Sequence, residues 1–230
     1  MNLKRDGEKE VQLNGIESEK NRPVFYESRL RERLCLAATM GASLLLLSGY
    51  EHFGGAEHEH LSIGFMALLF LHLVLNRKQQ ITNRLSGLVK NAFVLAVSFC
   101  LVSGVLLSRY DFPFFPNLPH AEQVVSIHLA SACWCLVLAG LHVGLQMKCY
   151  ILTVPRWIIF PGRILVYALS FYGVVTLVTT RFAVYLVAGS YFGTQDSNVG
   201  SGEFFLQRAA IFALAAWVAQ RIGRGREKTR

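Results

Sequence analysis

Residues 58–72 read HEHLSIGFMALLFLH, and residues 128–142 read HLASACWCLVLAGLH. Each stretch begins and ends with histidine, and the two histidines of each stretch are 14 positions apart. In an α-helix this separation makes about four turns, so the second imidazole is rotated by only about 40° from the first and lies about 21 Å further along the axis. Each stretch therefore predicts an apolar helix that presents two imidazoles on one face, at two levels.

The composition of the chain is strongly apolar. Of its 230 residues, 53% are hydrophobic and only 17% are charged, which is less charge than soluble domains carry. The apolar residues also gather in runs that are long enough to span a bilayer as helices. We therefore expect an all-α, polytopic membrane helix bundle with a four-helix core and two C-terminal helices. The expected spans are residues 34–50, 56–76, 91–108, 121–147, 164–180 and 204–220.

The basic residues follow the order of the expected spans, and the net charge is +8. Lys and Arg gather before the first span and in every second connection. The opposite connections hold Glu51, Glu57 and Glu59, then Arg109 and Asp111, then Asp196. Because cytoplasmic loops are enriched in Lys and Arg, this alternation predicts that both termini are cytoplasmic. The basic residues lie at helix ends and form no stripe with interleaved aromatic residues. We therefore expect contact with membrane lipid and no nucleic-acid partner.

These boundaries divide the chain into four expected segments. A flexible cytoplasmic tail occupies residues 1–30, and the four-helix core occupies residues 31–150. Two further membrane helices, joined by a short segment at the outer interface, occupy residues 151–222. A basic cytoplasmic tail follows over residues 223–230.

The two histidine helices are the second and fourth expected spans, and they run in the same direction because one span separates them. His58 then lies level with His128 near the outer ends, and His72 lies level with His142 near the inner ends. Histidine inside a membrane is rare and usually functional. Haem iron takes two axial ligands, so we expect each level to hold one haem between two imidazoles. A haem with both positions filled serves to pass single electrons.

The other histidines are expected to play no part in this site. His60 lies 12 positions before His72, which turns it about 120° away on an ideal helix, so we expect a surface group. His52 and His120 fall in outer connections and are expected to be solvated. The alternative interpretation of the four paired histidines is that each one makes a hydrogen bond inside the bundle. The duplicated spacing favours haem binding over this alternative.

Small and polar residues near the paired histidines have two interpretations each. The glycines of these helices, including Gly104, either let a porphyrin approach the backbone or serve close helix packing. Asn76 and Gln146 each follow an inner histidine by four positions, and they either bind haem propionates or a quinone, or only mark the polar end of the helix. Arg181, at the outer end of the fifth span, either pairs with a haem propionate or contacts lipid head groups.

With these helices placed, the chain resembles a known family. HLSIGFMALLFLHLVLNRK and HLASACWCLVLAGLHVGLQMK, each preceded by a helix that ends in Ser-Gly, resemble the flavinylation-associated cytochromes, which are prokaryotic membrane b-type cytochromes with a four-helix core. The same spacing resembles the cytochrome b core of quinol-oxidising respiratory complexes. FYGVVTLVTTRFAVYLV, residues 171–187, is similar to the region that follows the core in the first family. The resemblance covers about residues 33–222.

This resemblance implies two haems b, a prokaryotic plasma (inner) membrane, exchange with the quinone pool, and an extracytoplasmic flavin-bearing partner. By motif match, the iron ligands are His58, His72, His128 and His142, and no catalytic residue is implied. It leaves open whether the chain is a quinone-linked oxidoreductase or only an electron-transfer subunit. The chain departs from the family at Ser62 and Ala132, where glycine is expected, and in residues 193–202, which lack an aromatic and acidic run.

Two other functions fit parts of the sequence. The outer stretch EHFGGAEHEH, residues 51–60, carries Glu and His side chains of the kind that capture Zn or Cu, as in a membrane metal-ion transporter. A membrane scaffold without a cofactor is the third interpretation.

Overall fold

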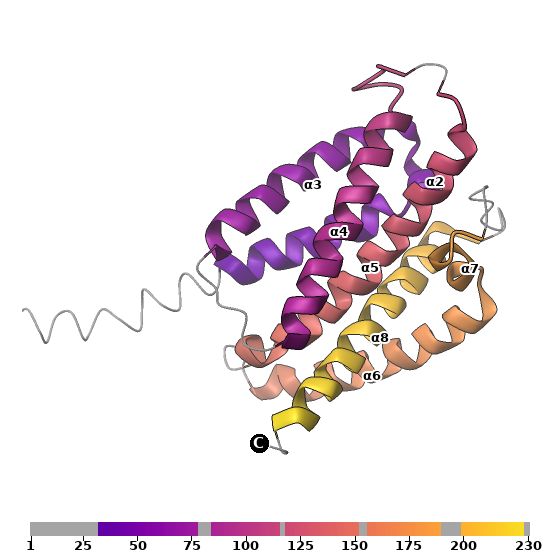
Figure 1. Cartoon of the computed structure of the whole chain (residues 1–230). Coiled ribbons are helices and arrows are strands. Elements are labelled where there is room, and N and C mark those ends of the chain that lie inside the picture. The colour runs from indigo at the N-terminus through magenta and orange to yellow at the C-terminus, as the bar shows by residue number, and fades with distance from the viewer. Residues whose placement is uncertain (1–31, 78–83, 116–117, 152–155, 190–198, 228–230) are drawn as a thin grey trace, which may run out of the picture.

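The structure is a computed structural model that describes residues 32–77, 84–115, 118–151, 156–189 and 199–227. In these ranges all of the regular secondary structure is helical, and no strand is found. The all-α prediction is therefore confirmed, and Figure 1 shows the helices gathered into one bundle. The expected tail over residues 1–30 lies outside the described residues.

The helices follow the apolar runs of the sequence. A helix over residues 32–47 comes first. It is followed by α2 (Tyr50–Phe53), α3 (Gly55–Asn76), α4 (Arg84–Leu107), α5 (Ala121–Ile151), α6 (Arg156–Thr179), α7 (Phe182–Leu186) and α8 (Ser201–Glu227).

Helices α3, α4, α5, α6 and α8 are long and apolar enough to cross a membrane. They match the second to sixth expected spans, although α4 and α6 begin earlier than expected. The first expected span, residues 34–50, is divided: its helix ends at residue 47 and a turn leads into the short α2. Gly54 separates α2 from α3 with a φ of 94°, which glycine adopts without steric cost.

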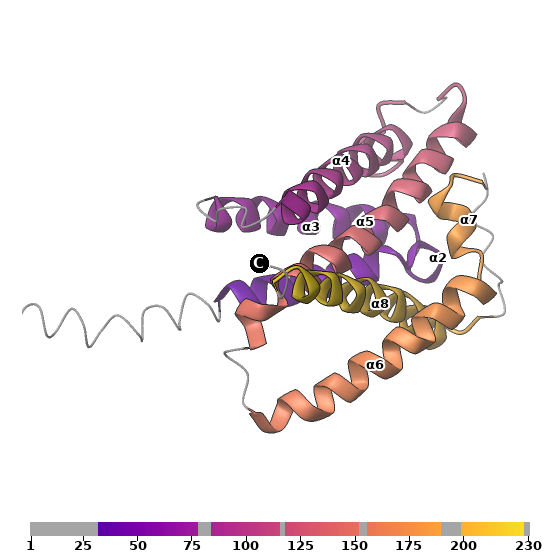
Figure 2. The ribbon, with the colours of Figure 1, turned by 60° about the horizontal axis from the view of Figure 1, so that its bottom comes forward.

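Helix α5 lies at the centre of the bundle. It packs closely against α4 on one side and against α8 on the other, and α6 packs on the far side of α8. Figure 2 shows this order, with α5 and α8 between α4 and α6. Two buried clusters result. Cys133 belongs to the cluster shared with α7 and α8, and Cys135 to the one shared with α4.

The predicted division at residue 150 is not a division of the packing. Helix α5 packs as extensively against α8 as against α4, so the four-helix core does not stand apart from the helices that follow it. Glycines make this close approach possible. A Cβ at Gly140 would lie 2.6 Å from the carbonyl oxygen of Phe212, and one at Gly144 would overlap that of Ala216. These two glycines therefore serve helix packing.

Helix α3, which carries His58 and His72, is the least embedded of the long helices. It makes few close backbone approaches to α4 or α5, and Phe65 is its one buried residue. Figure 1 shows α3 and the helix over residues 32–47 on one flank of the bundle. Helix α3, which supplies two of the four expected ligands, is thus not closely packed against α5, which supplies the other two.

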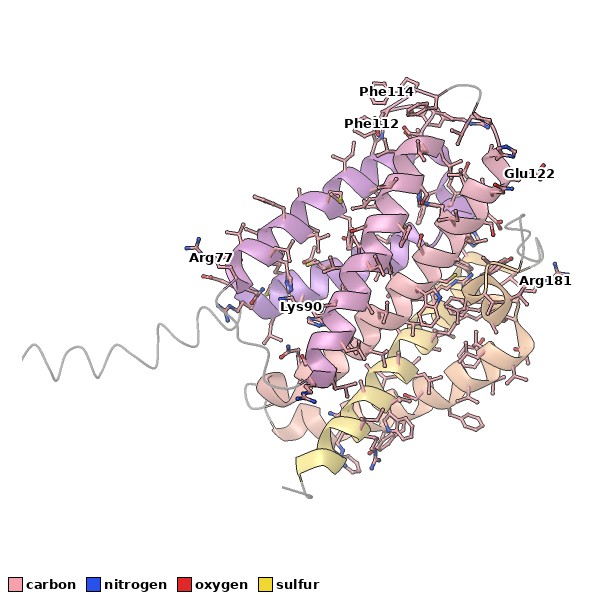
Figure 3. All side chains as sticks on the ribbon, in the orientation of Figure 1. Arg77, Lys90, Phe112, Phe114, Glu122 and Arg181 are labelled. Carbon is pink, nitrogen blue, oxygen red and sulfur yellow. The ribbon has the colours of Figure 1, made fainter. Side chains whose placement is uncertain are left out.

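The ends of the bundle differ in charge and allow a test of orientation. Figure 3 shows Arg77 and Lys90 toward one end and Phe112, Phe114 and Glu122 at the other. Because Lys and Arg favour the cytoplasmic side, a reporter fused after Arg230 is expected to be cytoplasmic and one inserted at Gly200 to be extracytoplasmic. Membrane-side reporter activity measures both. The same side for both fusions would mean that α6 or α8 does not cross.

Candidate functional site

The structure brings His58 of α3 and His128 of α5 together. Their ring centres are 6.3 Å apart and their planes are inclined by 77°. Two imidazoles that bind one metal ion from opposite sides, each through a nitrogen about 2 Å from the metal, have ring centres about 6 Å apart. Ordinary edge-to-face ring pairs have similar separations. The orientation of the ring nitrogens therefore decides whether the pair is a metal site or a simple packing contact.

The nitrogens of His128 are arranged as in a metal ligand. Its Nδ1 lies 3.0 Å from the carbonyl oxygen of Cys100 and 3.1 Å from the hydroxyl of Ser103. The Ser103 hydroxyl donates to the carbonyl of Phe99 at 2.6 Å, so it accepts from His128. Both partners therefore place the proton on Nδ1 and leave the lone pair of Nε2 free. Metal-binding histidines are commonly oriented through a backbone carbonyl in this way.

Gly104 gives the His128 ring its space. A Cβ at this position would lie 3.2 Å from Cε1 and 3.6 Å from Nδ1 of His128, which is tight for a side-chain contact. Of the two interpretations of Gly104, helix packing is not the one observed. Instead, the absence of a side chain lets the imidazole lie against α4, where the Cys100 carbonyl and the Ser103 hydroxyl reach it.

His58 contacts the end of the helix that precedes it, as His128 contacts the last turns of α4. The ring of Tyr50 meets it edge-on, with centres 5.4 Å apart, and the backbone carbonyl of Leu47 faces it. Ser62, which stands where the resembling family has glycine, donates to the backbone carbonyl of His58 at 2.7 Å. The repeated Ser-Gly ends of the two preceding helices thus lie beside the two outer histidines, which gives the internal repeat a structural role.

The inner histidines are arranged differently. No ring contact joins His72 to His142 in the part of the chain that the structure describes, although they lie within range of electrostatic interaction. His142 instead stacks on Phe93, with ring centres 6.4 Å apart. The amide nitrogen of Asn76 donates to the backbone carbonyl of His72 at 2.9 Å and lies 3.3 Å from its Nδ1. The amide nitrogen is a donor, so it favours an unprotonated Nδ1 and a proton on Nε2. Metal binding through Nε2 would therefore require the Asn76 amide to turn.

Two cations lie near this inner pair. Lys90 of α4 is within electrostatic range of both His72 and His142, and Arg33 is within range of His72. The Arg33 guanidinium also donates to the carbonyl oxygen of Leu75 at 3.2 Å. Neither residue stands out in the sequence, because basic residues at the ends of spans are explained by membrane topology alone.

The remaining predicted site residues lie apart from the paired imidazoles. Gln146 is half-buried one turn beyond His142, and its amide has no hydrogen-bond partner among the described residues. Arg181 is exposed at the start of α7, and Figure 3 shows its side chain directed outward from the bundle. This orientation favours contact with lipid head groups over contact with a haem propionate.

The unpaired histidines differ in exposure. His60 is mostly exposed, with 67% of its side-chain surface accessible, and lies 3.3 Å from Asp111, as expected of a surface group. The prediction that His52 is solvated is wrong. Its Nε2 is buried and has no hydrogen-bond partner among the described residues. Its ring lies 4.9 Å from that of Phe204, and its Nδ1 lies 3.1 Å from the Ser201 hydroxyl. The start of α8 covers His52, which the sequence of the connection does not reveal.

Helix α8 also carries a buried arginine that the sequence did not predict to be functional. The Arg208 guanidinium lies over the rings of Phe182 and Phe204, at 4.9 and 4.7 Å. Its Nε is buried and has no hydrogen-bond partner in the part of the chain that the structure describes. Burial raises the pKa of the nearby Tyr185 phenol, and the Arg208 charge partly opposes this shift. The sequence does contain an indication of this residue, since Arg208 falls inside an apolar span and ionisable residues are rare there.

Comparisons with known proteins add no assignment. No protein-family model, curated protein or solved structure matches the chain. The functional interpretation therefore depends on the residues and their geometry.

Proposed function

We propose that this chain is a di-haem b-type membrane cytochrome that carries electrons across a prokaryotic plasma membrane, between quinone and an extracytoplasmic flavin-bearing partner. The observation that carries the proposal is the outer pair of imidazoles. His128 is anchored through Nδ1, and its ring centre lies 6.3 Å from that of His58 on a helix that otherwise stands off.

The residues of the outer level fit a haem. His58 and His128 would supply the two axial nitrogens, and the Cys100 carbonyl would fix the orientation of one ring. Gly104 keeps that ring free of a steric conflict with α4. A haem b bound there would supply one-electron exchange, and its filled axial positions would exclude oxygen and substrates from the iron.

The inner level would be built from His72 and His142, with Asn76 turned away from the His72 ring. Lys90 and Arg33 lie within electrostatic range of this pair, and we assign to them the carboxylates of the inner haem. Gln146, whose amide has no partner among the residues that the structure describes, is the residue that we assign to a quinone or a propionate at this end. Two levels along helices of membrane-spanning length would carry electrons from one face toward the other.

The metal-transporter alternative is less well supported by the geometry of residues 51–60. Glu59 is directed to backbone N–H groups of the connection after α4, His60 lies beside Asp111, and His52 lies beside Ser201. These side chains point to separate partners. Across the described ranges, no three His, Cys, Asp or Glu side chains converge as metal ligands.

The absorption spectrum of the purified protein tests the proposal. We expect the bands of low-spin, six-coordinate haem b, unchanged by carbon monoxide because the iron has no open position. Pyridine haemochrome analysis is expected to give about two haems per chain, one for each histidine pair. A fully folded and colourless preparation, made in cells supplied with haem, would contradict the proposal.

A further inference from the structure

Glu59, the residue next to His58, is bound by the connection between α4 and α5. The Ser108 hydroxyl donates to its Oε2 at 2.6 Å, and the backbone N–H of Arg109 donates to its Oε1 at 2.8 Å. The N–H groups of the next two residues donate to Oε2 at 3.1 and 2.9 Å. One carboxylate thus accepts hydrogen bonds from four consecutive residues.

This arrangement is a built anion site that the chain fills with its own side chain. Successive backbone N–H groups in a turn form a concave site for an anion, and hydrogen bonds to an ionised acceptor are roughly twice as strong as neutral ones. Ser108 is itself fixed, because its hydroxyl accepts from the N–H of Phe112 at 2.8 Å. The neighbouring His60 side chain is mostly exposed, so its contact with Asp111 contributes little.

The contact matters because it ties the outer end of α3 directly to the connection between α4 and α5. The helix makes few close backbone approaches to α4 and α5. Glu59 and His58 are adjacent in sequence, so a rotation or shift of α3 that breaks the Glu59 hydrogen bonds also moves the His58 ring. His128, in contrast, is fixed from α4 through the Cys100 carbonyl. The geometry of the outer pair therefore depends on where Glu59 holds α3.

We propose that Glu59 is a positioning residue, whose carboxylate fixes α3 on the α4–α5 connection and so sets the distance and angle at which His58 faces His128. The inference rests on the proposed function, since it assigns Glu59 a role in the outer haem site. It predicts that Glu59 affects the outer haem and leaves the inner haem unchanged.

Three measurements on the haem-loaded full chain separate positioning from general stability. The ferric EPR signal of a haem with two imidazole ligands depends on the angle between the ring planes, which is 77° for the outer pair. Hydrogen exchange of the backbone amides of residues 109–111 reports whether the carboxylate is bound, whether or not haem is present. The rate of haem transfer to an acceptor protein gives the strength of each site.

Glu59→Gln is the test variant, because the amide keeps the shape but turns an NH2 group toward N–H donors. We expect faster exchange at residues 109–111, a shifted EPR signal for the outer haem alone, and loss of the outer haem that is faster by about tenfold. Glu57→Gln is the matched control: Glu57 is exposed on the same helix, and its variant is expected to match the wild type.

The outcomes are distinct. Faster amide exchange with an unchanged outer EPR signal would overturn the positioning role, as would equal effects of the Glu57 and Glu59 variants. If Glu59→Gln does not accumulate, Ser108→Ala removes only the 2.6 Å hydrogen bond and is expected to shift the same signal by less; no shift would overturn the inference. A colourless wild-type protein would instead refute the proposed function, and the positioning role would fall with it.

Discussion

Alanine at His58 or at His128 is expected to remove the same haem, so that each variant keeps about half of the wild-type haem. The reason is geometric: the centres of the two rings lie 6.3 Å apart, and an iron that loses one of its two imidazoles loses most of its hold on the protein. Replacing His72 or His142 is expected to remove the other haem. A redox titration of each variant identifies the haem that is left.

His60→Ala is the matched control for the outer site. His60 lies two positions from His58, but its side chain is mostly exposed and lies beside Asp111. The variant is therefore expected to keep both haems and both potentials. Loss of a haem from His60→Ala, with both haems kept in His58→Ala, would show that the histidine spacing of 12 positions is the real one.

Gly104→Val is expected to have the second largest effect. Even a Cβ would lie 3.2 Å from Cε1 of His128, so the valine methyl groups must displace the imidazole from the Cys100 carbonyl and the Ser103 hydroxyl. Overpacking of this kind costs about 1–3 kcal/mol of stability, and here it also turns the ligand nitrogen away. We expect loss of the outer haem with the inner haem retained, measured by haemochrome analysis and redox titration.

Gly162→Val controls for the effect of valine in a membrane helix. A Cβ at Gly162 of α6 would meet no atom within 4 Å, so this variant is expected to keep both haems. A Gly104→Val protein with both haems and unchanged potentials would mean that Gly104 serves no purpose for His128.

The sequence was sufficient for the helices and for the meeting of the outer histidines. Long apolar runs require helices, because only internal hydrogen bonding satisfies a backbone in lipid, and α3 to α6 and α8 follow those runs. The parallel order of the second and fourth spans brought His58 level with His128, and their ring contact agrees with this. Cys133 and Cys135 lie in different buried clusters, because side chains two positions apart point to different faces of a helix.

Other features depend on groups that carry no sequence signal. The N–H groups that bind Glu59 belong to the backbone of a connection, and any residues there would supply them. The place of His52 under α8 arises from a contact between positions 149 residues apart. For the Asn76 amide the sequence left two interpretations open, binding of a ligand or the polar end of a helix. In the structure the amide donates to the backbone of its own helix, at His72 four positions earlier.

The haem content of the double variant His58→Ala with His128→Ala tests the central claim most directly. If the two residues bind opposite faces of one iron, removing both costs no more than removing either one. Pyridine haemochrome analysis is then expected to give about one haem per chain for the double variant and for each single variant. A double variant that loses both haems, while each single variant loses one, would show that His58 and His128 bind different irons and would contradict the account.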